Sequence, residues 1–449
     1  MTAELSISEA GLLLRSGELT SAALVQAALD RIAARDGRLH AFADVFAEAA
    51  LAEAAAADLA LAEGRDLGPL HGIPLGIKEM IDIAGRPTQA GSRVSMPVAG
   101  ADAVAVARLR AAGAVILGAV QTYEFATVGP DESLPQPPAC NPWNPDHITG
   151  GSSSGSAAAV AGGLVRASLG TDTGGSVRSP AAYCGVVGLK PSKGRVPPAG
   201  TLPLSPSLDH IGPIAATVEE AALVLDAISD PGWRPAAARI GQGVQGLRVG
   251  YLRDWVAGDP AATPGVIRAL DDAASVLSML GAQIVPLDLP DYAVWESAGA
   301  VLLDGEALAA HRDRIAAEGA HYGSACLRSL LRGIALDDGD MATAWEVARL
   351  FGRRFDALLE SVDVVLTATT LAPAPPVAAF RGGRAVWTAM RTLPLNATGH
   401  PAMSIPAGFE GGLPVGLQLI GAMGAEDVLA QVGHAFERAT DHSVQRPPV

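Results

Sequence analysis

The chain has 449 residues, of which 49% are hydrophobic and 18% charged, so it can bury a large core and is not disordered. Its net charge of −15 disfavours direct binding of nucleic acid, which needs clustered basic side chains. No apolar run reaches the roughly 18 residues of a membrane helix, and the N-terminus lacks the features of a signal peptide. The three cysteines, Cys140, Cys184 and Cys326, lack zinc spacing. We therefore expect a cytoplasmic protein.

Helical and strand-like patterns alternate along the first half of the chain, which predicts a sheet covered by helices on both faces. Thr20 or Ser21 is placed to cap the second helix. A Pro-rich loop over 129–149 lies directly before a Gly/Ser-rich stretch, and we expect it either to shape a pocket or to cross the surface. The expected elements are two helices within 6–34, helices over 43–63 and 101–112, and strands within 68–83, over 114–121 and near 166–170.

The second half opens with a predicted strand–helix–strand unit over 247–287, after a surface loop over 230–246. A helical, weakly patterned segment over 292–359 follows it. The remaining expected elements are helices over 217–228 and 425–440 and strands over 362–367, 403–406 and 415–419.

The most distinctive stretch, 150–178, contains two Gly/Ser-rich turns. The first reads GGSSSG over 150–155, and the second reads TGGS over 173–176. Glycines let the backbone approach a ligand closely, and consecutive N–H groups in such turns can bind an anion. The small apolar residues that follow the first turn predict a buried turn entering a helix, in contrast to a flexible linker.

This stretch, which continues as GTDTGGSVRSPAAYCGVVGLKP, resembles the signature of the amidase signature family. Members of that family hydrolyse amides with a Ser–cis-Ser–Lys triad. The resemblance covers about 39–214 and resumes at 401–421. It assigns the triad to Ser176, Ser152 and, in GPLHGIPLGIKEM, Lys78.

The resemblance also implies the architecture. We expect a single amidase signature domain over 1–449, of α/β class, with a mixed, mostly parallel central sheet covered by helices on both faces. Residues 1–65 would be an N-terminal helical segment within it, and 290–360 a variable helical region over the substrate entrance. Two residues depart from the family pattern: Ser154 replaces a usual Gly, and Glu79 replaces a usual Asp.

Lysine usage singles out Lys78. Only three of the 32 basic residues are lysines, and only a lysine, not an arginine, can lose its proton near neutral pH when buried. Lys190 and Lys193 lie in a turn-like segment and are expected at its surface, whereas Lys78 lies in an apolar, strand-like stretch. To act as a base, Lys78 needs a pKa lowered from about 10.4 to about 7. The alternative is a structural lysine paired with Glu79 or Asp82, although adjacent strand residues point to opposite faces.

The remaining site residues follow from the proposed chemistry. Ser176 would attack the amide carbonyl, and N–H groups of the turn would stabilise the oxyanion. Ser152 would relay the proton to Lys78, and the resemblance implies a cis peptide between Gly151 and Ser152. The expected oxyanion and substrate-binding residues are Thr173, Gly174, Gly175 and Ser176, the supporting residues are Asp172, Arg178 and Gly151, and His71, His147 and His210 are expected to be polar loop or core residues.

The main functional prediction is an amidase that cleaves a carboxamide or urea-like bond of a small molecule through an acyl-enzyme on Ser176. We expect no cofactor, no metal, no direct contact with nucleic acid and no membrane partner, and leave a homodimer open. The close alternative is the A subunit of a tRNA-dependent amidotransferase, which works in a complex and obtains ammonia from glutamine. Co-purification with partner subunits separates the two.

Two further alternatives belong to other classes. GSSSG also fits the G-x-S-x-G nucleophile elbow of α/β-hydrolases, with Ser153 as nucleophile and His400 or His434 as its partner. That interpretation leaves TDTGGS and Lys78 without a role. A non-catalytic interaction protein would leave all three triad residues without one.

Overall fold

Eleven strands form one mixed sheet, in the spatial order β1-β3-β2-β4-β6-β5-β10-β11-β9-β7-β8. The computed structural model describes residues 5–289, 292–382 and 384–448. The strands are β1 (Phe42–Val45), β2 (Pro74–Lys78), β3 (Val115–Val120), β4 (Ala167–Asp172), β5 (Val187–Lys190), β6 (His210–Ala215), β7 (Arg248–Tyr251), β8 (Gln283–Pro286), β9 (Val364–Ala368), β10 (Ala402–Glu410) and β11 (Leu413–Ile420).

The sheet is mixed, but the expectation that it is mostly parallel was wrong. Four neighbouring strand pairs are parallel and six are antiparallel. The parallel pairs lie towards the two ends of the sheet, where the sequence alternates between strand and helix. Near the middle, β10 and β11 form a hairpin through Gly411 and Gly412, whose φ angles of 60° and 82° suit a two-residue turn. The antiparallel pairs near the middle include this hairpin and the pair of β5 with β6, whose strands follow one another without an intervening helix.

Helices cover both faces of the sheet, as the alternating pattern predicts. One apolar cluster joins the sheet to α4, α7, α9 and α14, and a second joins it to α2, α3, α5 and α6. The helices are α1 (Ile7–Ser16), α2 (Ser21–Leu39), α3 (Ala47–Ala62), α4 (Val104–Ala111), α5 (Ser154–Ala161), α6 (Arg178–Cys184), α7 (Val218–Ile228), α8 (Asp254–Ala257), α9 (Pro264–Met279), α10 (Tyr292–Glu318), α11 (Ser324–Leu330), α12 (Asp338–Leu359), α13 (Pro394–Thr398) and α14 (Glu426–Ala439).

Most expected elements are present, and one of the two expected capping residues is confirmed. Thr20 is the residue that caps α2, accepting a hydrogen bond from the N–H of Ala23. The helix expected from residue 43 begins only at Ala47, because β1 precedes it and pairs with β3. Strands β5 and β6 lie in stretches for which the sequence pattern predicted no strand.

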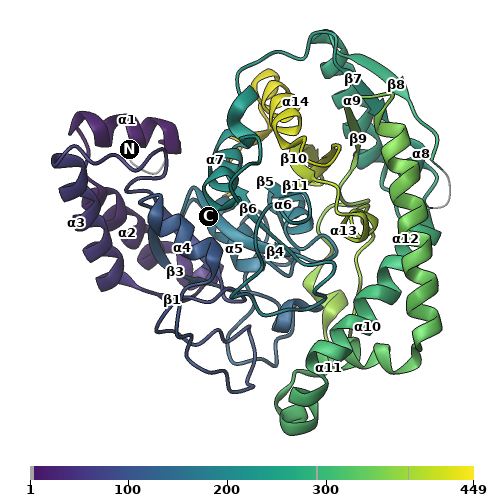
Figure 1. The fold of residues 1–449 in the computed structure, drawn as a ribbon, viewed down its shortest axis with the longest axis horizontal. Helices are drawn as coiled ribbons and strands as arrows, with labels where there is room; N and C mark the ends of the chain where they lie inside the picture. The colour runs from purple at the N-terminus through teal and green to yellow at the C-terminus, as the bar shows by residue number, and fades with distance from the viewer. Residues whose placement is uncertain (1–4, 290–291, 383, 449) are drawn as a thin grey trace.

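The N-terminal helices α1 to α3 and the helical segment of α10 to α12 lie at opposite ends of the molecule (Figure 1). Between α11 and α12 a short 3₁₀ helix, η4 (Leu331–Ala335), packs against α10. None of the helices that the structure describes is both long and apolar enough to cross a membrane.

Candidate active site

Lys78 is the last residue of β2 and is fully buried. Its ammonium contacts three hydroxyl groups: Nζ lies 2.7 Å from Ser152 Oγ, 2.7 Å from Thr171 Oγ1 and 3.0 Å from Ser153 Oγ. Strand β4, which carries Thr171, runs parallel to β2 and so presents this hydroxyl beside the lysine. These three partners are neutral groups, each of which can accept or donate a proton.

Burial lowers the pKa of Lys78 from its ordinary value to about 7, and the negative charges of Asp172 and Asp209 oppose this shift. A substantial fraction of the amine is thus neutral near neutral pH. Glu79, the neighbour that could have neutralised it, is itself buried, and burial raises the pKa of its carboxyl to about 8. Both features fit a lysine that can accept a proton.

The peptide bond between Gly151 and Ser152 is cis, as the family resemblance implies. Ser152 is fully buried, and its carbonyl accepts hydrogen bonds from the N–H groups of Tyr123 and Ser154. Gly151 packs against the Tyr123 ring so closely that a Cβ atom there would lie 2.2 Å from a ring carbon. This position therefore requires glycine. Ser154, the departure from the family pattern, begins α5 and is buried.

Ser176 lies in the turn between β4 and α6 and is partly exposed. Asp172, at the end of β4, organises this turn: its carboxylate accepts from the N–H groups of Gly175 (2.8 Å) and Val177 (3.1 Å). The positive charge of Arg178 holds the pKa of Asp172 well below its usual range, against the effect of burial. Asp172 therefore stays ionised and shapes the backbone that carries Ser176.

The bond from Gly175 to Asp172 corrects one detail of the expected oxyanion site. The Gly175 N–H, which we expected to face the substrate, already has an internal acceptor. Thr173, Gly174 and Ser176 line the adjoining cavity, so the oxyanion donors we now expect are the N–H groups of Gly174 and Ser176. Gly175 instead provides a φ of 129°, a backbone conformation that side chains disfavour.

Arg178 is fully buried, and its hydrogen bonds link the turn that carries Ser176 to distant parts of the chain. Its guanidinium donates to both carboxylate oxygens of Asp172, to Gln418 Oε1 (2.9 Å) and to Asn396 Oδ1 (2.6 Å). Asn396 in turn donates to Asp172 Oδ1 at 2.8 Å. The sequence analysis did not identify Thr171, Asn396 or Gln418. Asn396 is the one polar residue in the apolar stretch LPLNA, and this isolated position is the sequence feature that could have indicated a buried hydrogen-bonding role.

Of the other two lysines, Lys190 is not at the surface, contrary to expectation, and Lys193 is only partly exposed. Lys190 is fully buried at the end of β5 and donates to the carbonyl of Pro191, while burial lowers its pKa well below the ordinary value. Lys193 is partly buried and donates to the carbonyls of Pro206 and Asp209. The turn-like sequence around Lys190 does not indicate that this residue is the last of strand β5 and is therefore buried in the sheet. Lys78 differs from both in contacting serine and threonine hydroxyls.

The nucleophile-elbow alternative does not fit the contacts. Ser153 is fully buried, and its hydroxyl contacts Lys78 and the backbone of Thr171. His400 contacts Asp356 and Thr398 instead of this serine. The histidines near the motifs were expected to be polar loop or core residues, and their ring nitrogens contact backbone carbonyl oxygens: 3.0 Å for His71, 2.6 Å for His147 and 2.6 Å for His210.

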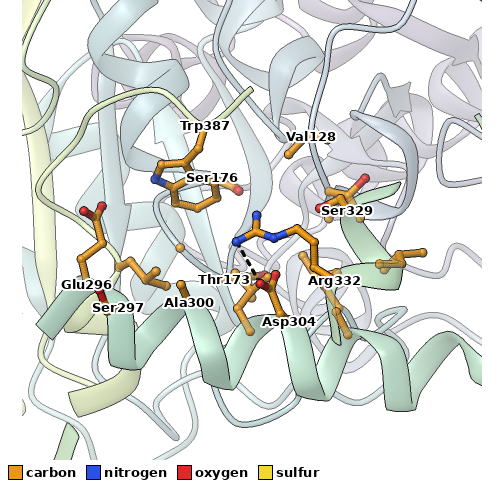
Figure 2. Close-up of a pocket in the computed structure, with 18 residues that line it drawn as sticks. Val128, Thr173, Ser176, Glu296, Ser297, Ala300, Asp304, Ser329, Arg332 and Trp387 are labelled. Atoms are coloured by element: carbon orange, nitrogen blue, oxygen red, sulfur yellow. Dashed lines mark ion pairs between the residues drawn. The ribbon is translucent and has the colours of Figure 1, made fainter. Parts of the chain in front are cut away.

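Ser176 opens onto a cavity of about 290 Å³ (Figure 2). One wall comes from α10 and η4, in the helical region over 290–360 that we expected near the substrate entrance. A second, smaller cavity of about 40 Å³ also reaches Ser176 and includes Gly151 and Tyr123.

No group of three or more His, Cys, Asp or Glu side chains that could hold a metal occurs among the residues the structure describes. The three cysteines carry no disulfide. We therefore expect dialysis against EDTA to leave kcat/KM for amide hydrolysis unchanged within about twofold, because the lysine and hydroxyl groups supply the chemistry. Loss of activity that one divalent ion restores would contradict this prediction.

A buried lysine hydrogen-bonded to Ser152 and Ser153, with a further serine in a glycine-rich turn at a cavity, is the arrangement of an amide-cleaving serine hydrolase. The chain belongs to the amidase family, whose profile matches residues 23–429. A curated relative, the A subunit of glutamyl-tRNA(Gln) amidotransferase from Synechococcus sp. (strain WH7803), is 39% identical over 97% of each chain. The same-named protein of Chloroflexus aggregans is 38% identical over 99% of this chain and 98% of its own.

Solved structures give the same fold. A protein from a complex described as revealing the origins of an s-triazine catabolic enzyme has a TM-score of 0.90 at 34% identity, over 97% of this chain and 98% of its own. The peptide amidase of Stenotrophomonas maltophilia has a TM-score of 0.86 at 34% identity, over 100% and 99%. The A subunit of glutamyl-tRNA(Gln) amidotransferase from Thermotoga maritima has a TM-score of 0.80 at 30% identity, over 98% and 95%.

Proposed function

We propose that this chain is the glutamine-hydrolysing A subunit of a tRNA-dependent amidotransferase. The observation that carries the proposal is the full-length similarity, at 37–39% identity, to relatives of that name. The sequence analysis held this function as its alternative, and the relatives favour it over a free-standing amidase. The net charge of −15 fits a protein that leaves tRNA binding to its partners.

The contact between Lys78 and Ser152 supports a reaction in two half-reactions. Ser176 Oγ attacks the side-chain carbonyl of glutamine while its proton passes through the Ser152 hydroxyl to neutral Lys78. The Gly174 and Ser176 N–H groups stabilise the oxyanion. The carbon–nitrogen bond then breaks, the nitrogen takes the proton back through the same relay, and ammonia leaves an acyl-enzyme. Water attacks this ester with the same proton path, which yields glutamate and restores Ser176.

A free-standing amidase for apolar acyl groups is the second candidate. Apolar side chains line much of the larger cavity, among them Leu204, Leu303 and Leu393. Such a surface favours an alkyl or aromatic acyl group over a polar one. The structural similarity to a peptide amidase at 34% identity is consistent with this candidate.

The two candidates differ in substrate and partners. A glutamine-hydrolysing amidotransferase component should release ammonia from glutamine faster than from apolar carboxamides of similar size, and should co-purify with the other amidotransferase subunits encoded in its source organism. A free-standing amidase should prefer the apolar amides and elute alone. Ammonia release by the purified chain, with and without those subunits, measures the difference. Efficient turnover of apolar amides together with inertness towards glutamine in both preparations would overturn the proposal.

A further inference from the structure

A further cavity, of about 350 Å³, lies where the loop over 198–206 meets the sheet. This loop supplies most of its wall, and strands β4 and β6 supply Thr171, His210 and Ile211. Ser176 does not line it. We call it the loop cavity and distinguish it from the two cavities that reach Ser176.

Two buried polar atoms of residues in this wall have no hydrogen-bond partner within the part of the chain that the structure describes. They are Nε2 of His210 and Oγ1 of Thr201. His210 is only 5% exposed, so bulk water does not satisfy its ring. Leaving buried polar atoms unpaired is costly, and native structures rarely do so. An occupant of the loop cavity that pairs with these atoms would remove that cost.

The Nε2 atom of His210 is an acceptor. Burial lowers the pKa of His210 well below its ordinary value, and the positive charges of Lys190 and Lys193 act in the same direction. The ring is therefore neutral and carries one proton. The Leu208 carbonyl oxygen, 2.6 Å from Nδ1, can only accept, so Nδ1 holds that proton. An occupant must therefore bring an O–H or N–H group to Nε2.

The rest of the wall indicates which kind of molecule fits. It is mainly apolar and includes Pro203 and Ile211. Its one charged side chain among the described residues, Asp209, already accepts from Thr173 Oγ1 (2.6 Å) and from the N–H of Leu204 (3.0 Å). Water suits such a wall poorly, because each buried water needs two to four polar partners. A molecule with an apolar body and one donor group suits it better.

We propose that the loop cavity is a regulatory site for a small neutral molecule with an apolar body and one O–H or N–H group, which donates a hydrogen bond to Nε2 of His210. The hydroxyl of Thr201 offers a second polar contact, because it can donate or accept. Binding at this site does not depend on which amide the protein hydrolyses.

Two contacts link the loop cavity to Lys78. Thr171 lines the cavity, and its Oγ1 lies 2.7 Å from Lys78 Nζ. The N–H of Leu202, in the loop, donates to the carbonyl of Met80, two residues after Lys78 (2.9 Å). An apolar occupant keeps water away from this region and so disfavours the ammonium that forms when Lys78 accepts a proton. Binding should therefore lower kcat by roughly fivefold or more and leave KM unchanged.

Phenol and toluene have nearly the same shape, and only phenol can donate a hydrogen bond. Calorimetry should show one phenol bound per wild-type chain. His210→Phe removes Nε2 and keeps a ring, so the affinity for phenol should fall roughly tenfold while that for toluene stays within about twofold. The Leu208 carbonyl keeps a donor in this variant, since Asn396 Nδ2 lies 3.3 Å from it. His147→Phe is the matched control, because His147 also has Nδ1 at a carbonyl (2.6 Å) but does not line the loop cavity.

A second variant locates the ligand without changing His210. Ala199 is exposed and lines the loop cavity, so Ala199→Phe should narrow the cavity and weaken both ligands by a similar factor. Protein whose Ser176 carries a serine-directed reagent should still bind phenol. Equal affinity for phenol in the wild-type and His210→Phe proteins, or loss of binding after labelling of Ser176, would overturn the site.

Steady-state kinetics on the amide that the protein hydrolyses best test the regulatory effect. A lower kcat at saturating phenol, with KM unchanged, supports it. An increase in KM alone would place phenol in the substrate cavity, and an unchanged kcat would overturn the link to Lys78. The binding measurements need no amide, so failure of the proposed function and failure of this inference are distinguishable.

Discussion

Replacing Ser176 with alanine is expected to lower kcat/KM for amide hydrolysis by roughly three orders of magnitude or more. The hydroxyl lies at the cavity, and the covalent intermediate cannot form without it. Because the turn is held by Asp172 through backbone N–H groups, alanine at this position should leave the melting temperature within a few degrees. A serine-directed covalent reagent should label the wild-type protein and fail to label Ser176→Ala.

Ser153→Ala is the informative comparison for this experiment. Ser153 also contacts Lys78, but it is fully buried and is not part of the cavity wall. We expect the Ser153 variant to keep measurable activity and to remain reactive towards the reagent. If Ser176→Ala retained more than a few per cent of the activity while Ser153→Ala lost it, Ser153 would be the nucleophile and the elbow interpretation would replace the triad.

The expected triad residues could be named from the sequence because they lie in motifs that resemble those of the amidase signature family. Gly151 must be glycine to pass the Tyr123 ring, and Gly175 adopts a backbone angle that other residues avoid. The scarcity of lysine drew attention to Lys78. These residue types can be seen in the sequence itself, although the contact that explains Gly151 appears only in the structure.

Contacts between distant segments were not accessible in the same way. Asn396 reaches Asp172 across 224 positions of sequence, and the ion pair of Asp304 with Arg332 depends on how α10 packs against η4. The prediction of a mostly parallel sheet was wrong for the same reason. Short strands such as β5 and β6 are specified by their neighbours in the sheet more than by their own sequence pattern. The prediction that Lys190 lies at the surface was wrong because its burial follows from the pairing of β5 with β10.

Replacing Lys78 with arginine is expected to reduce kcat/KM almost as severely as replacing it with alanine, by roughly three orders of magnitude. Arginine keeps the positive charge but cannot be deprotonated near neutral pH, so it cannot accept the proton that Ser152 relays. The structure also predicts that arginine at this position destabilises the fold. The Lys78 site is fully buried, and its hydrogen-bond partners are hydroxyl groups, so a permanently charged guanidinium there should lower the melting temperature.

Lys78→Met separates the loss of the base from this destabilisation. Methionine is neutral and of similar length, so the variant should fold well and still be inactive. Lys190→Met is the matched control, since Lys190 is the other fully buried lysine and donates a hydrogen bond to a backbone carbonyl. That variant should keep activity within a few-fold of the wild type. Activity above about a tenth of wild type in Lys78→Arg would remove Lys78 from the mechanism.

The pH dependence provides an independent test of the same role. Because burial lowers the pKa of Lys78 to about 7, its neutral form predominates above that pH and its charged form below it. The neutral form is the base, so kcat/KM should rise with pH through an apparent pKa near 7 and then level off. On the acid side each unit of pH should cost about tenfold in rate. This pKa belongs to the coupled group of Lys78 and its hydroxyl partners, so Ser153→Ala should shift it measurably. A rate that stayed constant from pH 5 to 9 would show that no group of this kind titrates in the rate-determining step, and Ser176 would need a different base.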